Sequence, residues 1–370
     1  MGSRVHPVLG RFTFILALLG AGLIGASFTG LVPNSAARQM GSRLAIPDAF
    51  LKPGTLVDVG GYRLNLYSYG TGGPTIVLDA GAGWGAVGWA GIQERLARAA
   101  GTRVISYDRA AMNFSDIGPV EREPDRTVRD LHEMLRRAVI PGPYVLVGWS
   151  MGGMIVRWFA ARYPEETAAV VTVDGSTVDF ADPAADPEVY AWLPRAIRQF
   201  QEARTAAEKK LFDSDPDLFR RCSRLINPLQ SDEGLRRALE DRARDPRVYA
   251  HWIYFLEHAR EFDDACRRER RSLGAIPLRV LVAGEHLRQT GKSDADFVRD
   301  SFRVASLSED GLMTAVPGTT HGMHLDKPEA LIGLMVEAVQ AARSSRGPLK
   351  PPPPPGVPDR MGSSPHTSER

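Results

Sequence analysis

Apolar residues between positions 55 and 177 fall into two alternating patterns. One consists of short runs rich in β-branched residues, and the other repeats apolar residues every three or four positions. The first pattern is typical of a buried strand and the second of an amphipathic helix. Strands that alternate with helices of this length predict an α/β fold, with a mostly parallel sheet flanked by helices on both faces.

The strand-like runs stop near residue 177 and resume about a hundred positions later. They lie at 57–69 (a hairpin around a Gly-Gly turn), 75–78, 103–107, 144–147, 170–173, 278–283 and 312–316. Residues 178–274 are rich in Arg, Glu, Ala and Leu, with helical periodicity and no convincing strand pattern. We therefore expect a core in two parts, 55–177 and 275–343, and a helical cap of residues 178–274 inserted before the second-to-last strand.

The beginning of the chain differs from this core. Residues 12–32 carry no charge, follow two arginines, and are about as long as a membrane-spanning helix. We expect residues 1–37 to be a membrane anchor that leaves the rest of the chain outside the cytoplasm. The alternative is export by a signal peptide, cleaved near the small residues Ser35-Ala36-Ala37.

Two further segments are expected to lie outside the core. Residues 38–54 are interpreted as a linker between the N-terminal segment and the first strand. Residues 344–370 include five consecutive prolines and few apolar residues. Such a segment buries too little surface to offset its chain entropy, so we expect a disordered tail.

Charge and cysteine content exclude several classes of protein. The chain has 46 Lys and Arg against 44 Asp and Glu, a net charge of +2, so no nucleic-acid partner is expected. Two cysteines, Cys222 and Cys266, are too few for a disulfide scaffold and lack the spacing of a zinc site. They would form at most one bridge in an exported protein and would stay free thiols in the cytosol.

One pentapeptide indicates nucleophilic chemistry. Gly148-Trp149-Ser150-Met151-Gly152 fits the G-x-S-x-G pattern, directly after a strand-like run and at the start of a helical pattern. The glycines permit a tight turn that exposes the Ser150 hydroxyl, and the helix start supplies backbone N–H groups for developing negative charge. Asp108 and Arg109, which close an earlier strand-like run, are interpreted as structural braces for the loop after that strand.

A serine hydroxyl needs a base to become a nucleophile, so a histidine is expected in the second part of the core. Only His321 lies in a Gly/Thr-rich loop between the last strand and the last helix, and we predict it as the base. His286 also follows the cap. His324 lies closer to the last helix and is interpreted as a surface or pocket residue.

From about residue 55 to 343, the sequence resembles the α/β-hydrolase superfamily, in particular bacterial members with an N-terminal hydrophobic anchor. The segments that carry the resemblance are L-D-A-G-A-G, Y-D-R-A, Y-V-L-V-G-W-S-M-G-G, V-T-V-D-G and G-T-T-H-G-M-H-L-D-K-P. The resemblance implies the chain order Ser, acid, His. It also implies an oxyanion hole built from the backbone N–H groups of Ala82 and Met151.

The acid departs from the common pattern of the family. Many members place it three residues past the glycine that ends the second-to-last strand, where this chain has Leu287. Some relatives, including haloalkane dehalogenases, place it instead at the end of the strand after the nucleophile helix, and this position matches Asp174. Asp294 and Asp296, in the predicted loop after Gly284, remain alternatives.

These residues together predict a serine hydrolase. We expect it to cleave a carboxylic ester through an acyl-enzyme, with Ser150, Asp174 and His321 as the triad and neither metal nor organic cofactor. The expected partner is a small-molecule ester, and a membrane-anchored enzyme would suit an apolar acyl group. An amidase, a peptidase or an acyltransferase would use the same triad. A non-catalytic binding protein on the same fold is the alternative from another class.

Overall fold

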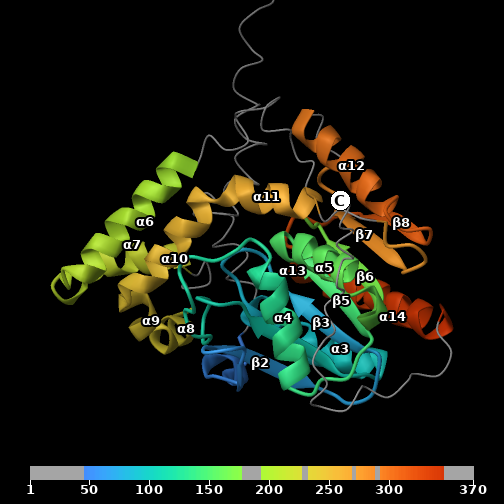
Figure 1. Ribbon diagram of the computed structural model, residues 1–370, viewed down its shortest axis with the longest axis horizontal. Coiled ribbons are helices and arrows are strands. Elements are labelled where there is room, and N and C mark those ends of the chain that lie inside the picture. Colours follow the sequence, from blue (N-terminus) through green and yellow to red (C-terminus); the bar gives the residue numbers. More distant parts are fainter. Residues whose placement is uncertain (1–45, 177–192, 227–231, 269–271, 288–291, 346–370) are drawn as a thin grey trace, which may run out of the picture.

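The computed structural model describes residues 46–176, 193–226, 232–268, 272–287 and 292–345. At its centre is an eight-stranded sheet with the strand order β1-β2-β4-β3-β5-β6-β7-β8 (Figure 1). Strands β1 and β2 pair antiparallel with each other, and β2 pairs antiparallel with β4. All other pairs are parallel. The predicted fold class, a mostly parallel sheet flanked by helices, is confirmed.

The bounds of the elements follow the sequence patterns closely. The strands are β1 (Thr55–Asp58), β2 (Arg63–Tyr69), β3 (Thr75–Asp79), β4 (Val104–Asp108), β5 (Tyr144–Trp149), β6 (Thr167–Val173), β7 (Leu278–Ala283) and β8 (Gly311–Val316). The core helices are α3 (Gln93–Ala100), α4 (Arg126–Arg137), α5 (Met151–Arg162), α12 (Lys292–Ala305), α13 (Met323–Asp326) and α14 (Pro328–Ser345). Between β6 and β7 lie α6 (Leu193–Glu208), α7 (Pro216–Ile226), α8 (Glu233–Ala238), α9 (Glu240–Arg244), α10 (Pro246–Glu257) and α11 (Ala259–Arg268).

The central strands are buried on both faces, which explains their continuous apolar runs. Every residue of β3, β4, β5 and β6 is buried. Helices α4, α5 and α12 pack on one face of the sheet and α3 and α14 on the other (Figure 1). The carboxyl ends of the parallel strands therefore meet at one edge, where loops can assemble a site.

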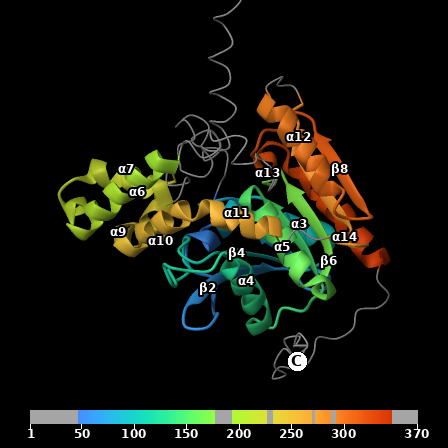
Figure 2. The ribbon, with the colours of Figure 1, turned by 45° about the horizontal axis from the view of Figure 1, so that its top comes forward.

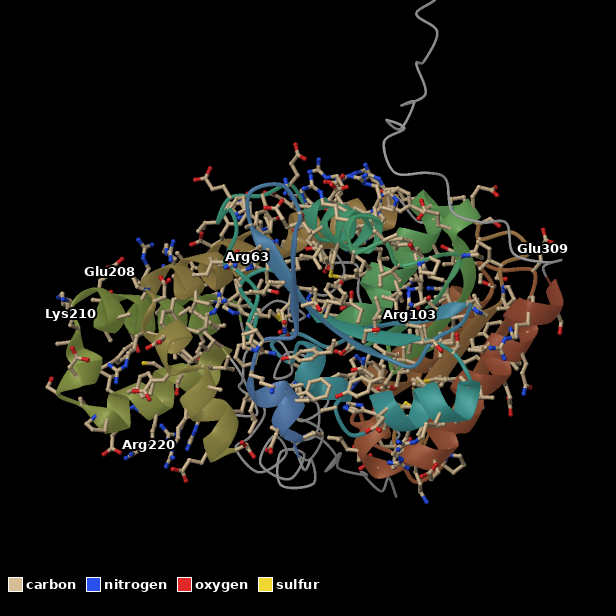
Figure 3. The ribbon with its side chains drawn as sticks, turned by 90° about the horizontal axis from the view of Figure 1, so that it is seen from below. Arg63, Arg103, Glu208, Lys210, Arg220 and Glu309 are labelled. Atoms are coloured by element: carbon tan, nitrogen blue, oxygen red, sulfur yellow. The ribbon has the colours of Figure 1, made fainter. Side chains whose placement is uncertain are left out.

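Helices α6 to α10 form a layer beside the sheet, on the side away from β8, and α11 leads from this layer to α5 (Figure 1 and Figure 2). Trp158 of α5 packs edge-on against Phe262 of α11, with ring centroids 5.9 Å apart, so one apolar cluster joins this layer to the core. Charged side chains such as Glu208, Lys210 and Arg220 lie exposed at its outer edge (Figure 3). This outer edge is thus a solvated surface, whereas Arg242 of α9 donates to the carbonyl of Ser115 in the core.

One expectation about the second half of the core is wrong. Asp294 and Asp296 do not lie in a loop after Gly284, because residues 292–305 form α12. The predictions for residues 1–37 and 346–370 fall outside the described residues and stay predictions. Among the helices that the structure describes, none combines the length and apolar character of a membrane span. Cys222 and Cys266 are buried free thiols.

Candidate active site

Ser150 stands at a sharp turn between β5 and α5. Its backbone has φ 54° and ψ −122°, a conformation that residues other than glycine rarely adopt. A Cβ atom at Gly148 would lie 2.2 Å from the carbonyl oxygen of Gly152, and one at Gly152 would lie 2.3 Å from that of Asp79. Only glycine fits at either position, so the motif is required by the geometry of the turn that presents Ser150.

Asp174 and His321 meet at the same edge of the sheet. Asp174 directly follows β6, and His321 lies in the loop between β8 and α13. The Nδ1 atom of His321 lies 2.7 Å from Oδ2 of Asp174. The Ser150 N–H donates to the carbonyl of Val173, 3.2 Å away, which places the serine one residue from Asp174 along the neighbouring strand.

Asp174 is held firmly in place. Its Oδ1 accepts a hydrogen bond from the N–H of Ala283 (2.8 Å), and its own N–H donates to the carbonyl of Leu281 (2.7 Å). Burial alone would raise the pKa of Asp174. Hydrogen bonds from His286 and His321 outweigh this effect and hold the pKa well below its usual value. The carboxylate is therefore ionised and, as an acceptor only, accepts a hydrogen bond from the Nδ1–H of His321.

His321 is positioned by its backbone as well as by its ring. Its carbonyl accepts from the indole N–H of Trp149 (2.8 Å), and its N–H donates to Glu285 (2.9 Å). Because Nδ1 is hydrogen-bonded to Asp174, Nε2 is the ring nitrogen that can exchange a proton with a substrate or with Ser150. Nε2 is buried and has no hydrogen-bond partner among the described residues, Ser150 included. In unliganded sites such contacts often close only when substrate binds.

The turn after β3 packs against the serine. A Cβ atom at Gly81 would lie 3.3 Å from the Cβ of Ser150 and 3.1 Å from the Trp149 ring. Ala82 follows in this turn, and Met151 is the first residue of α5. Neither N–H donates a hydrogen bond to another residue in the described ranges. Both groups therefore remain available to an incoming oxygen.

Arg109 holds this turn, in addition to contacting Met112 in the loop after its own strand, where a bracing role was expected. Its guanidinium donates to the carbonyls of Ala80 (2.7 Å) and Gly81 (2.8 Å) and pairs with the buried carboxylate of Asp79. Burial raises the pKa of Asp79, and the charge of Arg109 opposes that rise. Because their carbonyls are fixed by Arg109, the peptide groups of the turn keep one orientation.

The other two histidines after the cap also lie at the site. His286 contacts the same carboxylate oxygen as His321, with Nε2 3.3 Å from Oδ2 of Asp174, and its Nδ1 lies 2.9 Å from Oδ1 of Asp294. His324 is 2% exposed, so it is not a surface residue. Its ring packs against Trp149 (centroids 4.5 Å apart) and Trp89 (5.2 Å).

The two alternative acids are not placed against His321. Asp294 contacts His286, and Asp296 pairs with Arg299 on the outer side of α12. Both were alternatives because they were expected in the loop after Gly284, but they belong to α12, which directs them away from His321. No group of three or more metal-binding side chains occurs in the part of the chain that the structure describes.

A Ser-presenting turn, a His–carboxylate pair and free backbone N–H groups at the carboxyl edge of a mostly parallel sheet define the class of α/β hydrolases. Comparison with known proteins agrees, because residues 73–256 match the family model described as alpha/beta hydrolase fold. The chain belongs to this family.

Individual relatives cover only part of the chain. An uncharacterized protein of Bacillus subtilis, YbdG, is 28% identical over 123 residues, which are 33% of this chain and 37% of the relative. A pimeloyl-[acyl-carrier protein] methyl ester esterase of Sodalis glossinidius is 30% identical over 135 residues, 35% of this chain and 49% of the relative. The chain thus spans less than half the length of these curated relatives.

Solved structures match over most of the chain. The structure of a "putative epoxide hydrolase" mutant from Pseudomonas aeruginosa is similar with a TM-score of 0.57 and 21% identity, over 79% of this chain and 97% of that one. At this level of identity, the likeness shows the fold alone.

Proposed function

We propose that this protein is a serine hydrolase that cleaves a carboxylic ester through an acyl-enzyme. The observation that best supports the proposal is that Ser150, at its strained turn, lies at the same sheet edge as the Asp174–His321 pair. The family relationship supports hydrolysis, and the name of the Sodalis glossinidius relative favours an ester as substrate.

In the first half of the reaction, Nε2 of His321 takes the proton of the Ser150 hydroxyl as Oγ attacks the ester carbonyl carbon. The N–H groups of Ala82 and Met151 would bind the oxyanion that forms. Collapse of the tetrahedral species breaks the bond to the alcohol oxygen, which leaves with the proton held by His321. Ser150 then carries the acyl group.

In the second half, His321 removes a proton from water, and the resulting hydroxide adds to the acyl carbon. The second tetrahedral species releases the carboxylic acid and returns the proton to Ser150. Asp174 keeps the Nδ1 proton on His321 throughout and stabilises the imidazolium that forms in each half. No group beyond the residues named is needed to balance the reaction.

Covalent labelling tests this proposal directly. A fluorophosphonate probe should modify Ser150, located by mass spectrometry of the purified protein, and labelling should vanish in Ser150→Ala and His321→Ala. Hydrolysis of a p-nitrophenyl ester should vanish with it. Ser306→Ala, at an exposed serine of the turn after α12, is the control and should leave labelling unchanged. A folded protein that the probe does not label at Ser150 would contradict the proposal.

A further inference from the structure

The contacts of Asp174 extend the His–carboxylate pair into a row of four side chains. Oδ2 of Asp174 lies 2.7 Å from Nδ1 of His321 and 3.3 Å from Nε2 of His286, and Nδ1 of His286 lies 2.9 Å from Asp294. The side chains of Asp174, His286 and Asp294 are 1%, 10% and 9% exposed. Imidazole and carboxylate thus alternate through a largely buried row.

The row requires a charged His286. An ionised carboxylate can only accept hydrogen bonds, so a ring between two carboxylates must donate from both nitrogens and is an imidazolium. Burial lowers the pKa of His286, but hydrogen bonds and charge from Asp174 and Asp294 reverse this and raise the pKa to about 9. The charge of Glu285, its neighbour in the chain, also raises this pKa.

The side chains around His286 come from two elements, the end of β6 and α12. Asp174 follows β6, Asp294 lies in the first turn of α12, and Phe297 of α12 packs on the imidazole ring with centroids 4.5 Å apart. Beyond Asp174 stands His321. The cation of His286 therefore lies next to the carboxylate that serves His321, screened from water by an aromatic ring.

We propose that His286 is a positioning residue of the hydrolytic site: its imidazolium, held by Asp294, orients Asp174 toward His321 and offsets part of the Asp174 charge. The proposal rests on the function proposed above. Because Oδ2 is shared, Asp174 stabilises the positive charge that His321 acquires less than an unshared carboxylate would. His286 thereby reduces the negative charge beside His321, in addition to fixing the geometry.

The pH profile separates this role from simple structural support. His286→Gln keeps an amide donor for Asp174 but removes the positive charge. In this variant, the acidic limb of the pH profile of kcat/KM, measured with a p-nitrophenyl ester, should shift to higher pH by roughly one unit. The reason is that the full charge of Asp174 then favours protonated His321. A purely structural residue would lower kcat without moving the limb. An active His286→Gln enzyme with an unshifted limb would overturn the proposal.

A matched control is available on α4. His132 also pairs with a carboxylate, with Nε2 2.9 Å from Glu166, and has no contact with the row. His132→Gln should leave the acidic limb where it is in the unsubstituted protein. An equal shift in both variants would show that loss of any His–carboxylate pair produces the effect, and would overturn the specific role of His286.

The protonation of His286 is also measurable without any substrate. Nitrogen-15 NMR of the full chain should show His286 with both ring nitrogens protonated at pH 7 and titrating near pH 9. Asp294→Asn should lower the pKa of His286 by about one unit. A neutral His286 at pH 7, or an unchanged titration in Asp294→Asn, would overturn the proposal. Failure of Ser150 labelling with this NMR result intact would instead reject only the proposed function.

Discussion

Asp174 is the residue through which most of the site is connected. It follows β6 with φ 44°, it accepts from the N–H of Ala283, and it contacts both His321 and His286. A carboxylate that is fully buried costs much free energy unless each oxygen has partners, and here each does. The neutral amide of asparagine would not satisfy the same set of donors.

Asp174→Asn is therefore expected to reduce kcat by about 10⁴-fold, because the amide no longer holds the Nδ1 proton on His321 and no longer stabilises the imidazolium. Steady-state hydrolysis of a p-nitrophenyl ester measures the loss. Asp296→Asn is the matched control, since this carboxylate pairs with Arg299 at the outer side of α12, and its kcat should change less than twofold. A larger loss in Asp296→Asn than in Asp174→Asn would contradict the assignment.

At the residue scale, the sequence predicted Ser150, Asp174 and His321 at positions that the structure brings to one edge. It did not predict the partnership of His286 with Asp174. The spacing typical of the family places the acid at Leu287, and this residue is exposed. The preceding residue, His286, is the one that contacts Asp174. A contact between the ends of β6 and β7 depends on strand order, and a single sequence does not reveal that order.

At the scale of elements, the turn between β5 and α5 depends on close backbone approach. Gly152 passes so near β3 that a Cβ atom would meet the Asp79 carbonyl oxygen at 2.3 Å and that of Ala80 at 2.9 Å. Both obstacles are backbone atoms, which cannot rotate away as a side chain can. The start of α5 and the turn that follows β3 are thus locked together at the site.

Gly152→Ala should destabilise the protein by about 1–3 kcal/mol, because α5 must move away from β3 to admit the methyl group. Urea unfolding followed by circular dichroism measures the change. Gly333→Ala tests the opposite case on α14, where a Cβ atom meets nothing within 4 Å, and should stabilise by about 0.5–1 kcal/mol. Equal unfolding midpoints for the two variants would contradict the close approach described here.

The strands were the elements most accessible to prediction, and α12 the least. Continuous apolar runs mark strands buried on both faces, so every expected strand is present. Helix α12 begins within the polar stretch 288–296, which has no apolar periodicity before Phe297. Nothing local therefore indicates where that helix starts, and its first turn carries Asp294.

At the scale of the whole molecule, buried histidines make stability depend on pH in opposite directions. Burial lowers the pKa of His324 from 6.5 to about 3, and burial together with Arg122 and Arg242 lowers that of His251 well below 6.5. The pKa of His286 is raised to about 9. The packing that produces these shifts joins distant segments, so sequence composition alone does not predict them.

The sign of each contribution follows from which state binds more protons. Below pH 6.5 the unfolded chain protonates His324 while the folded protein does not, so stability is lost as pH falls from 6.5 toward 3. His286 acts in the opposite sense. Its contribution is fully present below pH 6.5 and is lost as pH rises through about 9. We therefore expect the most stable range to lie near neutral pH.

His324→Phe isolates the acid side of this dependence. Phenylalanine keeps a ring against Trp89 and Trp149 and removes a titrating group whose two nitrogens are buried without partners among the described residues. Between pH 6.5 and pH 5 the unsubstituted protein should lose about 2 kcal/mol that the variant retains, since each pH unit contributes up to about 1.4 kcal/mol per proton. Urea unfolding at both pH values measures the difference. Equal losses in the two proteins would mean that His324 accepts a proton in the folded state, and the charge would then have to be stabilised beside Trp149.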